Sequence, residues 1–234
     1  MQKHPDQIRR MFGRIAHRYD LMNRLITFGQ DRSWRRRVLE LADPPWGGSL
    51  LDVGTGTGAI ARQATRRRTD LHVVGCDFSP RMLGVARTSR GGERVEWERA
   101  DALDLPFPDQ SFDCVTSGYL VRNVADIALA FREQARVLRG GGRVVCLETA
   151  PPPSGVLSPL VSFYLHRVLP RIGQLVVGDR RAYRYLTEST LDFLEPQRVA
   201  EVMEGAGLEV ECIERRMFGT QTILAAVKPG QERG

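Results

Sequence analysis

Lysine is nearly absent from this chain of 234 residues: Lys3 and Lys228 are its only two, and arginine supplies the rest of the 34 basic side chains. The net charge is +6 at pH 7 with histidine counted as neutral. This balance is compatible with ordinary solvated helix faces. It is also compatible with an anionic partner, either a nucleic acid or a lipid headgroup surface, so charge alone does not decide the class of partner.

No apolar stretch of the chain reaches the roughly 20 residues that a membrane-spanning helix needs. The longest apolar region, 156–177, is interrupted by His166, Arg167, Pro170 and Arg171. The N-terminus is polar and no apolar run follows it, so we expect no secretory signal peptide. We therefore expect a cytoplasmic protein, with contact at the inner face of the membrane as a further possibility.

Cysteine is scarce as well. The four cysteines are Cys76, Cys114, Cys146 and Cys212, and each stands in an apolar, strand-like run. This placement indicates reduced thiols in the core of the fold rather than a disulfide framework or a zinc site. We expect no metal ion in the functional site.

From residue 49 onward the sequence alternates between strand and helix patterns. Strands are predicted at 49–53, 72–77, 95–99, 112–117, 142–148, 208–215 and 220–227, and helices at 57–68, 80–88, 125–138 and 196–206. Gly140, Gly141 and Gly142 predict a turn between the helix at 125–138 and the next strand. Such alternation predicts an α/β fold with a doubly wound, mostly parallel sheet of seven strands.

Two segments lie outside this alternation. In the first, 1–48, apolar residues at 8, 12, 15, 19, 22 and 26 form one helix face, and a second helix is predicted at 33–41, so we interpret it as an N-terminal helical cap. The second, 151–195, begins with three prolines, and we interpret it as a helical lid insertion. The remaining 49–150 form the Rossmann-like core, and 196–234 complete its sheet.

The most informative motif joins the first predicted strand to the first predicted helix. It reads Leu50-Leu51-Asp52-Val53-Gly54-Thr55-Gly56-Thr57-Gly58. Glycine lacks a Cβ, so the backbone can turn tightly there and approach a ligand closely. The strand at 72–77 ends in Asp77, whose carboxylate can accept both hydroxyls of a ribose. The two features together predict a nucleotide-type cofactor site.

The spacing of these glycines favours S-adenosylmethionine over a dinucleotide. A dinucleotide site has the pattern G-x-G-x-x-G, which places a pyrophosphate on a helix N-terminus. Here the pattern is G-x-G-x-G, and Asp52 would face a phosphate unfavourably. The sulfonium and ammonium groups of S-adenosylmethionine suit that carboxylate. Asp101, after the strand at 95–99, is placed to meet the adenine amino group.

Four further stretches resemble the ubiquinone/menaquinone biosynthesis C-methyltransferase family, and the resemblance runs over about 12–195. They are Phe12-Gly13-Arg14-Ile15-Ala16-His17-Arg18-Tyr19-Asp20-Leu21-Met22-Asn23, continued by Phe28-Gly29 and Trp34-Arg35; Arg122-Asn123-Val124; Leu169-Pro170-Arg171-Ile172-Gly173; and Tyr183-Arg184-Tyr185-Leu186-Thr187-Glu188-Ser189. In addition, 105–113 looks like the loop before the fourth strand of class I methyltransferases.

The resemblance implies a class I methyltransferase fold and methylation of a ring carbon of a prenylated quinol, with demethylmenaquinol as the expected substrate. By this resemblance Thr57, Asp77, Asp101 and Ala102 match cofactor-contacting positions. Tyr19, Arg122 and Asn123 match positions that meet the quinol and carry the catalytic role. The full set expected around the cofactor is Asp52, Gly54, Gly56, Thr57, Gly58, Asp77, Phe78, Asp101, Ala102 and Gly118.

The reaction requires a phenol of the quinol to lose its proton, and a phenol with a pKa near ~10 is mostly protonated at neutral pH. Arg122 is the expected source of anion stabilisation, because its guanidinium stays charged and offers a forked donor. The identity of the base stays open. His17, His166 and Glu148 are candidates, whereas Tyr183 and Tyr185 are expected to pack the lid.

The chain departs from the family pattern at three places. Ala59 stands where an acid usually follows the glycine loop, Gly118-Tyr119-Leu120-Val121 replaces the usual Ser-Phe-Gly-Leu run, and the final strands end differently. The second change affects the wall between cofactor and substrate. Two alternatives therefore stay open: a paralogue that methylates another aromatic or polyketide-like small molecule, and a non-catalytic S-adenosylmethionine-binding protein.

A nucleic-acid methyltransferase is disfavoured, and we expect no nucleic-acid partner. The stretch Ser117-Gly118-Tyr119-Leu120 lacks the polar-Pro-Pro-aromatic motif of amino-directed enzymes, and Cys114 lies in a predicted strand rather than in a Pro-Cys loop. The apolar stripe at 8–26 and the apolar insertion are instead flanked by arginines, which predicts reversible contact with a membrane surface. The sequence leaves the oligomeric state open.

Overall fold

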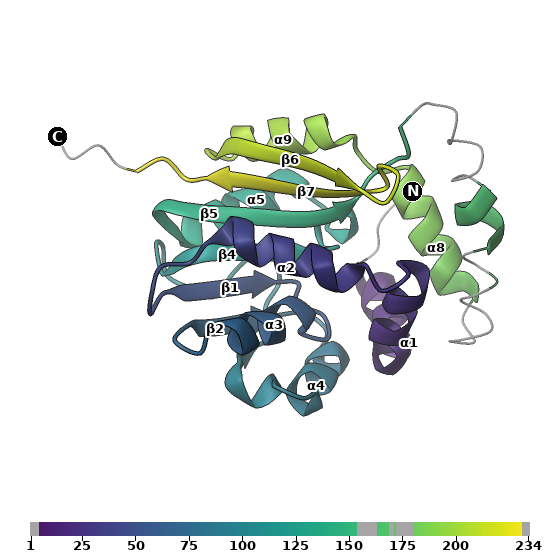
Figure 1. The fold of residues 1–234 in the computed structure, drawn as a ribbon, viewed down its shortest axis with the longest axis horizontal. Helices are drawn as coiled ribbons and strands as arrows, with labels where there is room; N and C mark the ends of the chain where they lie inside the picture. Colours follow the sequence, from purple (N-terminus) through teal and green to yellow (C-terminus); the bar gives the residue numbers. More distant parts are fainter. Residues whose placement is uncertain (1–4, 154–162, 169–170, 172–179, 231–234) are drawn as a thin grey trace.

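The computed structural model describes 5–153, 163–168, 171 and 180–230. A seven-stranded sheet runs through the centre in the order β3-β2-β1-β4-β5-β7-β6 (Figure 1). The strands are β1 (Ser49–Val53), β2 (His72–Cys76), β3 (Glu96–Glu98), β4 (Phe112–Gly118), β5 (Leu138–Thr149), β6 (Glu209–Arg216) and β7 (Gln221–Val227). The first five are mutually parallel, and β7 runs antiparallel to both its neighbours. The predicted fold class is confirmed.

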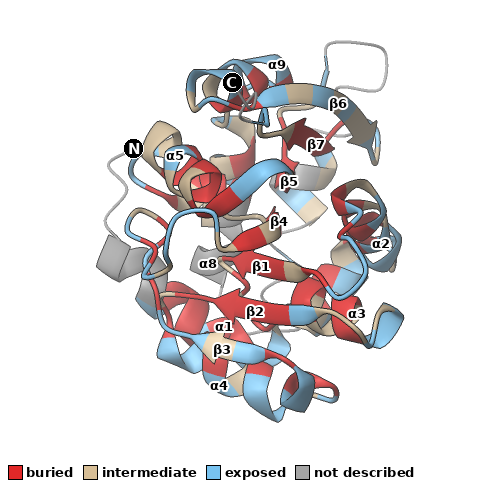
Figure 2. Ribbon diagram, turned by 90° about the vertical axis from the view of Figure 1, so that its left-hand side faces the viewer, coloured by how far each residue is buried: buried red, intermediate tan, exposed pale blue. Residues whose placement is uncertain are grey.

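Helices cover both faces of this sheet (Figures 1 and 2). One face carries α2 (Asp31–Ala42) and α3 (Ala59–Arg67), and the other carries α5 (Ile127–Val137) and α9 (Pro196–Gly205). The central strands are therefore buried on both sides, which explains their continuous apolar runs. In β1, Leu50 packs with Trp34 and Val38 of α2, whereas Leu51 faces the opposite layer with Phe131 of α5.

Element boundaries agree with the sequence prediction to within a few residues, except at the glycine triplet. The prediction of a turn at 140–142 is wrong, because β5 already begins at Leu138 and includes all three glycines. The register of β4 against β5 jumps between Phe112 and Cys114, so the glycines form an irregular start to the strand. A Cβ on Gly142 would meet the Asp113 carbonyl at 2.5 Å, so the close approach of β4 requires glycine there.

Two helices lie beyond the carboxyl ends of the parallel strands (Figure 1). They are α1 (Pro5–Ile26) and α8 (Arg180–Leu191); a short π-helical turn, Tyr164–Val168, precedes α8. On α1, Met11, Phe12, Ile15 and Met22 are buried and pack against Met82 of α4 (Pro80–Thr88). Ile8 of the predicted stripe lies outside the described side chains. The division into cap, core, lid and C-terminal segment stays a prediction.

Three-residue 3₁₀ helices, Gly92–Arg94 and Val121–Asn123, complete the described elements. In the part of the chain that the structure describes, no helix is both long and apolar enough to cross a membrane.

Candidate active site

A pocket opens at the carboxyl ends of β1, β2 and β4, beneath α1. Its wall contains eleven of the thirteen residues expected at the site: Tyr19, Asp52, Gly54, Gly56, Thr57, Asp77, Phe78, Asp101, Ala102, Gly118 and Asn123. The topology explains this gathering, because parallel strands present their carboxyl ends at one edge of the sheet, where ligands of open α/β folds bind. Gly58 and Arg122 are not part of this wall.

The glycine loop connects β1 to α3 in a conformation that only glycine adopts without strain. Gly54, Gly56 and Gly58 all have positive φ, at 64°, 58° and 78°. A Cβ on Gly56 would meet nothing within 4 Å, so this residue presents bare backbone to open space. A Cβ on Gly58 would overlap the Trp97 ring instead. The predicted contact of Gly58 with the cofactor stays a prediction. The structure shows that glycine is needed at this position to make room for the Trp97 ring.

Asp52 lies at the base of the pocket and is almost fully buried. Its carboxylate accepts hydrogen bonds from Thr55 Oγ1 at 2.5 Å, Thr116 Oγ1 at 2.9 Å and the Ala61 N–H at 3.3 Å. Burial raises the pKa of Asp52 to about 6, although these hydrogen bonds oppose the rise. The pKa of Asp52 is thus close to neutral pH, and a nearby cation would favour the charged form of this carboxyl group.

Asp77 follows β2 and organises the neighbouring edge of the pocket. It accepts the Gly56 N–H at 2.9 Å and the Ser79 N–H at 2.8 Å, which ties the glycine loop to the start of α4. Burial raises its pKa to about 6 as well. Asp101 beyond β3 is more exposed and accepts the Leu103 N–H at 3.0 Å. Both carboxylates line the pocket, in the order in which their strands stand in the sheet.

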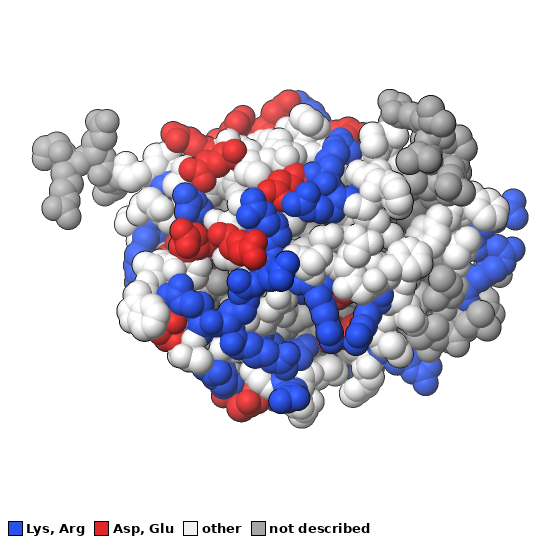
Figure 3. Space-filling model, in the orientation of Figure 1, with Lys and Arg blue, Asp and Glu red and all other residues white. Residues whose placement is uncertain are grey.

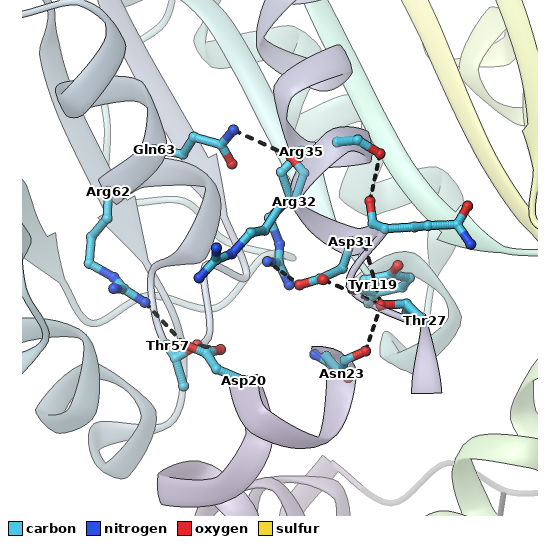
Figure 4. A network of polar contacts seen from close by, with 12 residues as sticks. Asp20, Asn23, Thr27, Asp31, Arg32, Arg35, Thr57, Arg62, Gln63 and Tyr119 are labelled. Atoms are coloured by element: carbon cyan, nitrogen blue, oxygen red, sulfur yellow. Dashed lines mark hydrogen bonds and ion pairs between the residues drawn. The ribbon is translucent and has the colours of Figure 1, made fainter. Parts of the chain in front are cut away.

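α1 closes this pocket and is attached directly to the glycine loop. Asp20 lies between Thr57 and Arg62 (Figure 4), accepting from Thr57 Oγ1 at 2.6 Å and from the Arg62 guanidinium at 3.1 Å. Phe12 and Tyr19 of the same helix line the wall above. Thr57 therefore joins the predicted cofactor loop to the predicted cap.

Tyr19 and Asn123 face the pocket, whereas Arg122 lies behind it. Burial raises the pKa of Tyr19, opposed by the charge of Arg122, so its hydroxyl stays protonated at neutral pH and is able to donate a hydrogen bond. Asn123 donates from Nδ2 to the Tyr119 carbonyl at 2.8 Å and accepts from the Tyr185 hydroxyl at 3.0 Å. Asn123 thus connects α8 to the pocket wall through Tyr185.

Arg122 is buried and forms an ion pair with Glu148. The Arg122 guanidinium also stands over the Tyr119 ring, 5.3 Å from its centroid. Glu148 is fully buried and accepts the Thr149 N–H at 2.8 Å and the Arg122 N–H at 3.2 Å. This ion pair supports the wall that Tyr119 forms. The catalytic role predicted for Arg122 stays a prediction, and the geometry adds a structural role to it.

The candidate bases do not gather at the pocket. His17 is exposed on α1 and is not part of the wall, and Glu148 faces Arg122 rather than the pocket. The side chains of His166 and Tyr183 lie outside the described residues.

Asn23 and Arg35 are among the wall residues that the sequence did not predict as site residues. A signal for Arg35 was present, because Asp31, Trp34, Arg35, Val38, Leu39 and Ala42 fall at helical spacing and are the buried residues of α2. Arg35 thus belongs to the buried stripe, whereas its neighbours Arg36 and Arg37 do not. For Asn23, the only signal in the sequence is its place next to Met22, which belongs to the buried face of α1.

Comparison with known sequences identifies the family. The model of the ubiE/COQ5 methyltransferase family matches residues 1–228. The ubiquinone/menaquinone biosynthesis C-methyltransferase UbiE of Desulfotalea psychrophila is 42% identical over 221 residues, covering 94% of this chain and 90% of the relative. The demethylmenaquinone methyltransferase of Thermus thermophilus is 44% identical over 221 residues, covering 94% of this chain and all of the relative.

Solved structures share the fold at low sequence identity. The [4+2]-cyclase SpnF superposes with a TM-score of 0.70 at 19% identity, covering 96% of each chain. A possible histamine N-methyltransferase of Thermotoga maritima gives a TM-score of 0.66 at 19% identity, covering 94% of this chain and 98% of that one. The family match over nearly the whole length is decisive: this chain belongs to the ubiE/COQ5 methyltransferase family and is an S-adenosylmethionine-dependent methyltransferase.

Proposed function

We propose that the chain methylates a ring carbon of demethylmenaquinol, using S-adenosylmethionine as the methyl donor. The observation that carries the proposal is a pocket whose wall brings together Asp52, Asp77 and the glycine loop with Tyr19 and Asn123. The relatives from Deinococcus radiodurans, at 45% identity, and from Thermus thermophilus are both named demethylmenaquinone methyltransferase.

The residues present fit this cofactor. Asp77 stands at the end of β2, where its carboxylate can accept both ribose hydroxyls, and Asp101 and Ala102 follow β3 on the adenine side. The open backbone at Gly56 allows close approach of the ligand. Asp52 supplies a negative charge where the amino-acid end of the cofactor would lie. Phe78 and Gly118 complete the expected wall.

When bound, the cofactor supplies an electrophilic methyl group on a sulfonium. The chain's own residues align the ring and stabilise its oxygen. The protonated Tyr19 hydroxyl donates to a quinol oxygen as it becomes anionic, and the charge of Arg122 behind it favours that anion. A pocket without water favours the reaction of the sulfonium with the quinol anion, because these opposite charges neutralise each other in the transition state. Good alignment of the two reactants lowers the activation free energy by up to roughly 7–11 kcal/mol in well-oriented systems.

Quinone analysis in living cells tests the substrate. The gene is expressed in a strain that lacks its own demethylmenaquinone methyltransferase, and quinones are identified by mass spectrometry. We expect menaquinone to reappear with this chain and not with a variant carrying Asp52→Ala and Asp77→Ala. Unchanged demethylmenaquinone, with the protein present and folded, would favour a paralogue that acts on another aromatic ring, a possibility raised by Gly118-Tyr119-Leu120-Val121.

Cofactor affinity is expected to fall as the pH is lowered through about 6. Asp52 and Asp77 both have a pKa raised to about 6 by burial, and the charge of Arg35 opposes the rise at Asp52. The ionised carboxylates bind an ammonium and a ribose diol better than the protonated ones do. The affinity for the cofactor should therefore be highest above pH 7 and should fall as the pH drops below the pKa of the two aspartates. Titration calorimetry should give a limiting slope between one and two decades per pH unit below pH 5. A flat profile from pH 5 to 8 would contradict this assignment.

We also propose that the end of the molecule near α1 rests on a membrane surface, where a prenylated quinol is found. Leu21, Leu25, Phe28 and Phe163 are exposed, and Phe28 lies against Tyr164 with ring centroids 6.2 Å apart. We call these four side chains the apolar end patch. Figure 3 shows an uncharged surface toward the right-hand end of the molecule, with basic side chains around it. Such a surface suits an anionic bilayer.

Vesicle sedimentation tests this contact. Wild-type protein should sediment with vesicles of anionic lipid at low salt and be released at high salt, since each cationic side chain near the surface contributes about 1 kcal/mol. Leu21→Glu with Leu25→Glu should abolish sedimentation. Trp46→Glu is the control, because Trp46 is also an exposed apolar side chain but precedes β1 at the opposite end of the sheet. Equal behaviour of the two variants, or no sedimentation of the wild type, would remove the membrane proposal.

A further inference from the structure

Arg35 and Asn23 place hydrogen-bond donors at one side of the pocket, where no role has been assigned to them. Arg35 comes from α2 and Asn23 from α1, and both line the wall. Asn23 is 9% exposed, and its Nδ2 has no acceptor at hydrogen-bond geometry among the described residues, although its side chain lies near the Tyr19 hydroxyl and lowers the pKa of Tyr19 against the effect of burial. A buried amide N–H without an acceptor is unfavourable, so its persistence in a pocket wall points to a ligand.

Asp31 holds the Arg35 side chain in place, but most of the hydrogen-bond donors of its guanidinium have no partner among the described residues. Arg35 is 9% exposed, and its Nη1 donates to Asp31 Oδ2 at 2.6 Å. A guanidinium has five N–H groups, and Asp31 is the only acceptor that the described residues offer it. The remaining donors of Arg35 are therefore open to a second anion, and Asp31 fixes the fork toward the pocket.

The corner between α1 and α2 brings the two residues together. Thr27 Oγ1 donates to the Asn23 carbonyl at 2.7 Å and accepts the Asp31 N–H at 3.3 Å. Figure 4 shows this chain of contacts from Asn23 through Thr27 and Asp31 to Arg35. The corner thus holds the Arg35 guanidinium through Asp31 and the Asn23 backbone through Thr27, so both residues are positioned before a ligand binds.

The order of the strands identifies the part of the cofactor that reaches this corner. Going along the sheet from β3 through β2 to β1 and β4, the pocket presents Asp101, then Asp77, then Asp52. Adenine and ribose occupy the first two positions, so the amino-acid end lies over β1 and β4. Arg35 lies close enough to the ends of these strands that its charge lowers the pKa of Asp52 and of Tyr119 against the effect of burial.

We propose that Arg35 and Asn23 bind the α-carboxylate of S-adenosylmethionine, opposite the Asp52 side that faces its ammonium group. The amino-acid end of the cofactor carries an ammonium and a carboxylate on one carbon. The pocket offers a carboxylate, Asp52, for the first and a guanidinium, Arg35, for the second. Arginine suits the task because its planar fork binds a carboxylate through two parallel hydrogen bonds. This inference rests on the proposed use of S-adenosylmethionine and names the residues that select its amino-acid end.

Calorimetry with a matched pair of ligands tests it. S-adenosylmethionine and its decarboxylated form, S-adenosyl-3-(methylthio)propylamine, differ only in the carboxylate. We expect the wild type to bind the first at least tenfold more tightly. Arg35→Met should weaken S-adenosylmethionine at least tenfold and change affinity for the decarboxylated ligand less than threefold, and Asn23→Ala should act in the same direction. Arg36→Met, on the exposed side of α2, should change neither.

Because Arg35→Met leaves the buried Asp31 without its cation, the variant pair Asp31→Asn with Arg35→Met is measured in parallel to preserve the fold. Equal losses for both ligands in this double variant would overturn the inference and mark Arg35 as structural. Equal affinity of the wild type for both ligands would also overturn it, while leaving methyl transfer intact. Failure of the wild type to bind either ligand would remove the proposed function itself.

Discussion

Replacing Arg122 with alanine is expected to lower the free energy of unfolding by about 3–5 kcal/mol. The guanidinium of Arg122 is almost fully buried, and its partner Glu148 is completely inaccessible. Removing the cation leaves a carboxylate in the interior without a counter-charge, which costs far more than the pair itself contributes. Denaturant unfolding measures the loss. Arg132→Ala, at an exposed position of α5, is the control and should change stability by less than about 0.5 kcal/mol.

The double variant Arg122→Met with Glu148→Gln separates fold from chemistry. It removes both charges and keeps an amide oxygen for one of the two backbone N–H groups, those of Thr149 and of residue 122, that bond to different oxygens of Glu148, so part of the lost stability should return. Cofactor affinity should stay within threefold of the wild type, because Arg122 is not part of the pocket wall. Turnover should remain at least tenfold reduced if Arg122 favours the quinol anion through Tyr19. Full recovery of turnover would restrict Arg122 to a structural role.

Asp77→Ala is expected to weaken S-adenosylmethionine at least tenfold. The Asp77 carboxylate lines the pocket, and the substitution leaves the ribose hydroxyls and the Gly56 and Ser79 N–H groups without their acceptor. Hydrogen bonds to charged groups are worth about 1.5–3 kcal/mol each, so a tenfold loss corresponds to one of them. Titration calorimetry at pH 8 measures the change with the native carboxylate fully ionised.

Asp70→Ala is the matched control for Asp77, because it lies before the other end of β2. Asp70 pairs with Arg68 and accepts the Gly47 N–H at 2.8 Å, away from the pocket. We expect this variant to bind S-adenosylmethionine like the wild type. Unchanged affinity in Asp77→Ala, or an equal loss in both variants, would contradict the assignment of the ribose site.

The sequence predicts the sheet and eleven residues of the pocket wall because the relevant signals are local. An apolar run that ends in Asp52 or Asp77 indicates both a buried strand and the edge at which its last side chain emerges. The glycines between 54 and 58 similarly report a backbone conformation that no other residue adopts easily. Parallel strands present their carboxyl ends at one edge of the sheet, so residues that follow different strands are predicted to share one pocket.

The contacts that the sequence does not reveal join residues far apart in the chain. Arg122 is a pocket residue by motif, but its pairing with Glu148 depends on the register of β4 against β5 and on the turn that follows. The link of Asp20 to Thr57 depends likewise on how α1 crosses the glycine loop. Three successive glycines, Gly140 to Gly142, predict a turn. In the structure they lie in β5, because β4 approaches them closely.

Methyl transfer by the purified chain tests the central claim most directly. The protein is incubated at pH 8 with methyl-labelled S-adenosylmethionine and demethylmenaquinol in detergent or vesicles, and the quinone product is analysed by mass spectrometry. Our account predicts menaquinol with one labelled methyl group on a ring carbon, together with an equal amount of S-adenosylhomocysteine. Tight cofactor binding without any labelled quinone would contradict the account and show that this pocket serves another substrate.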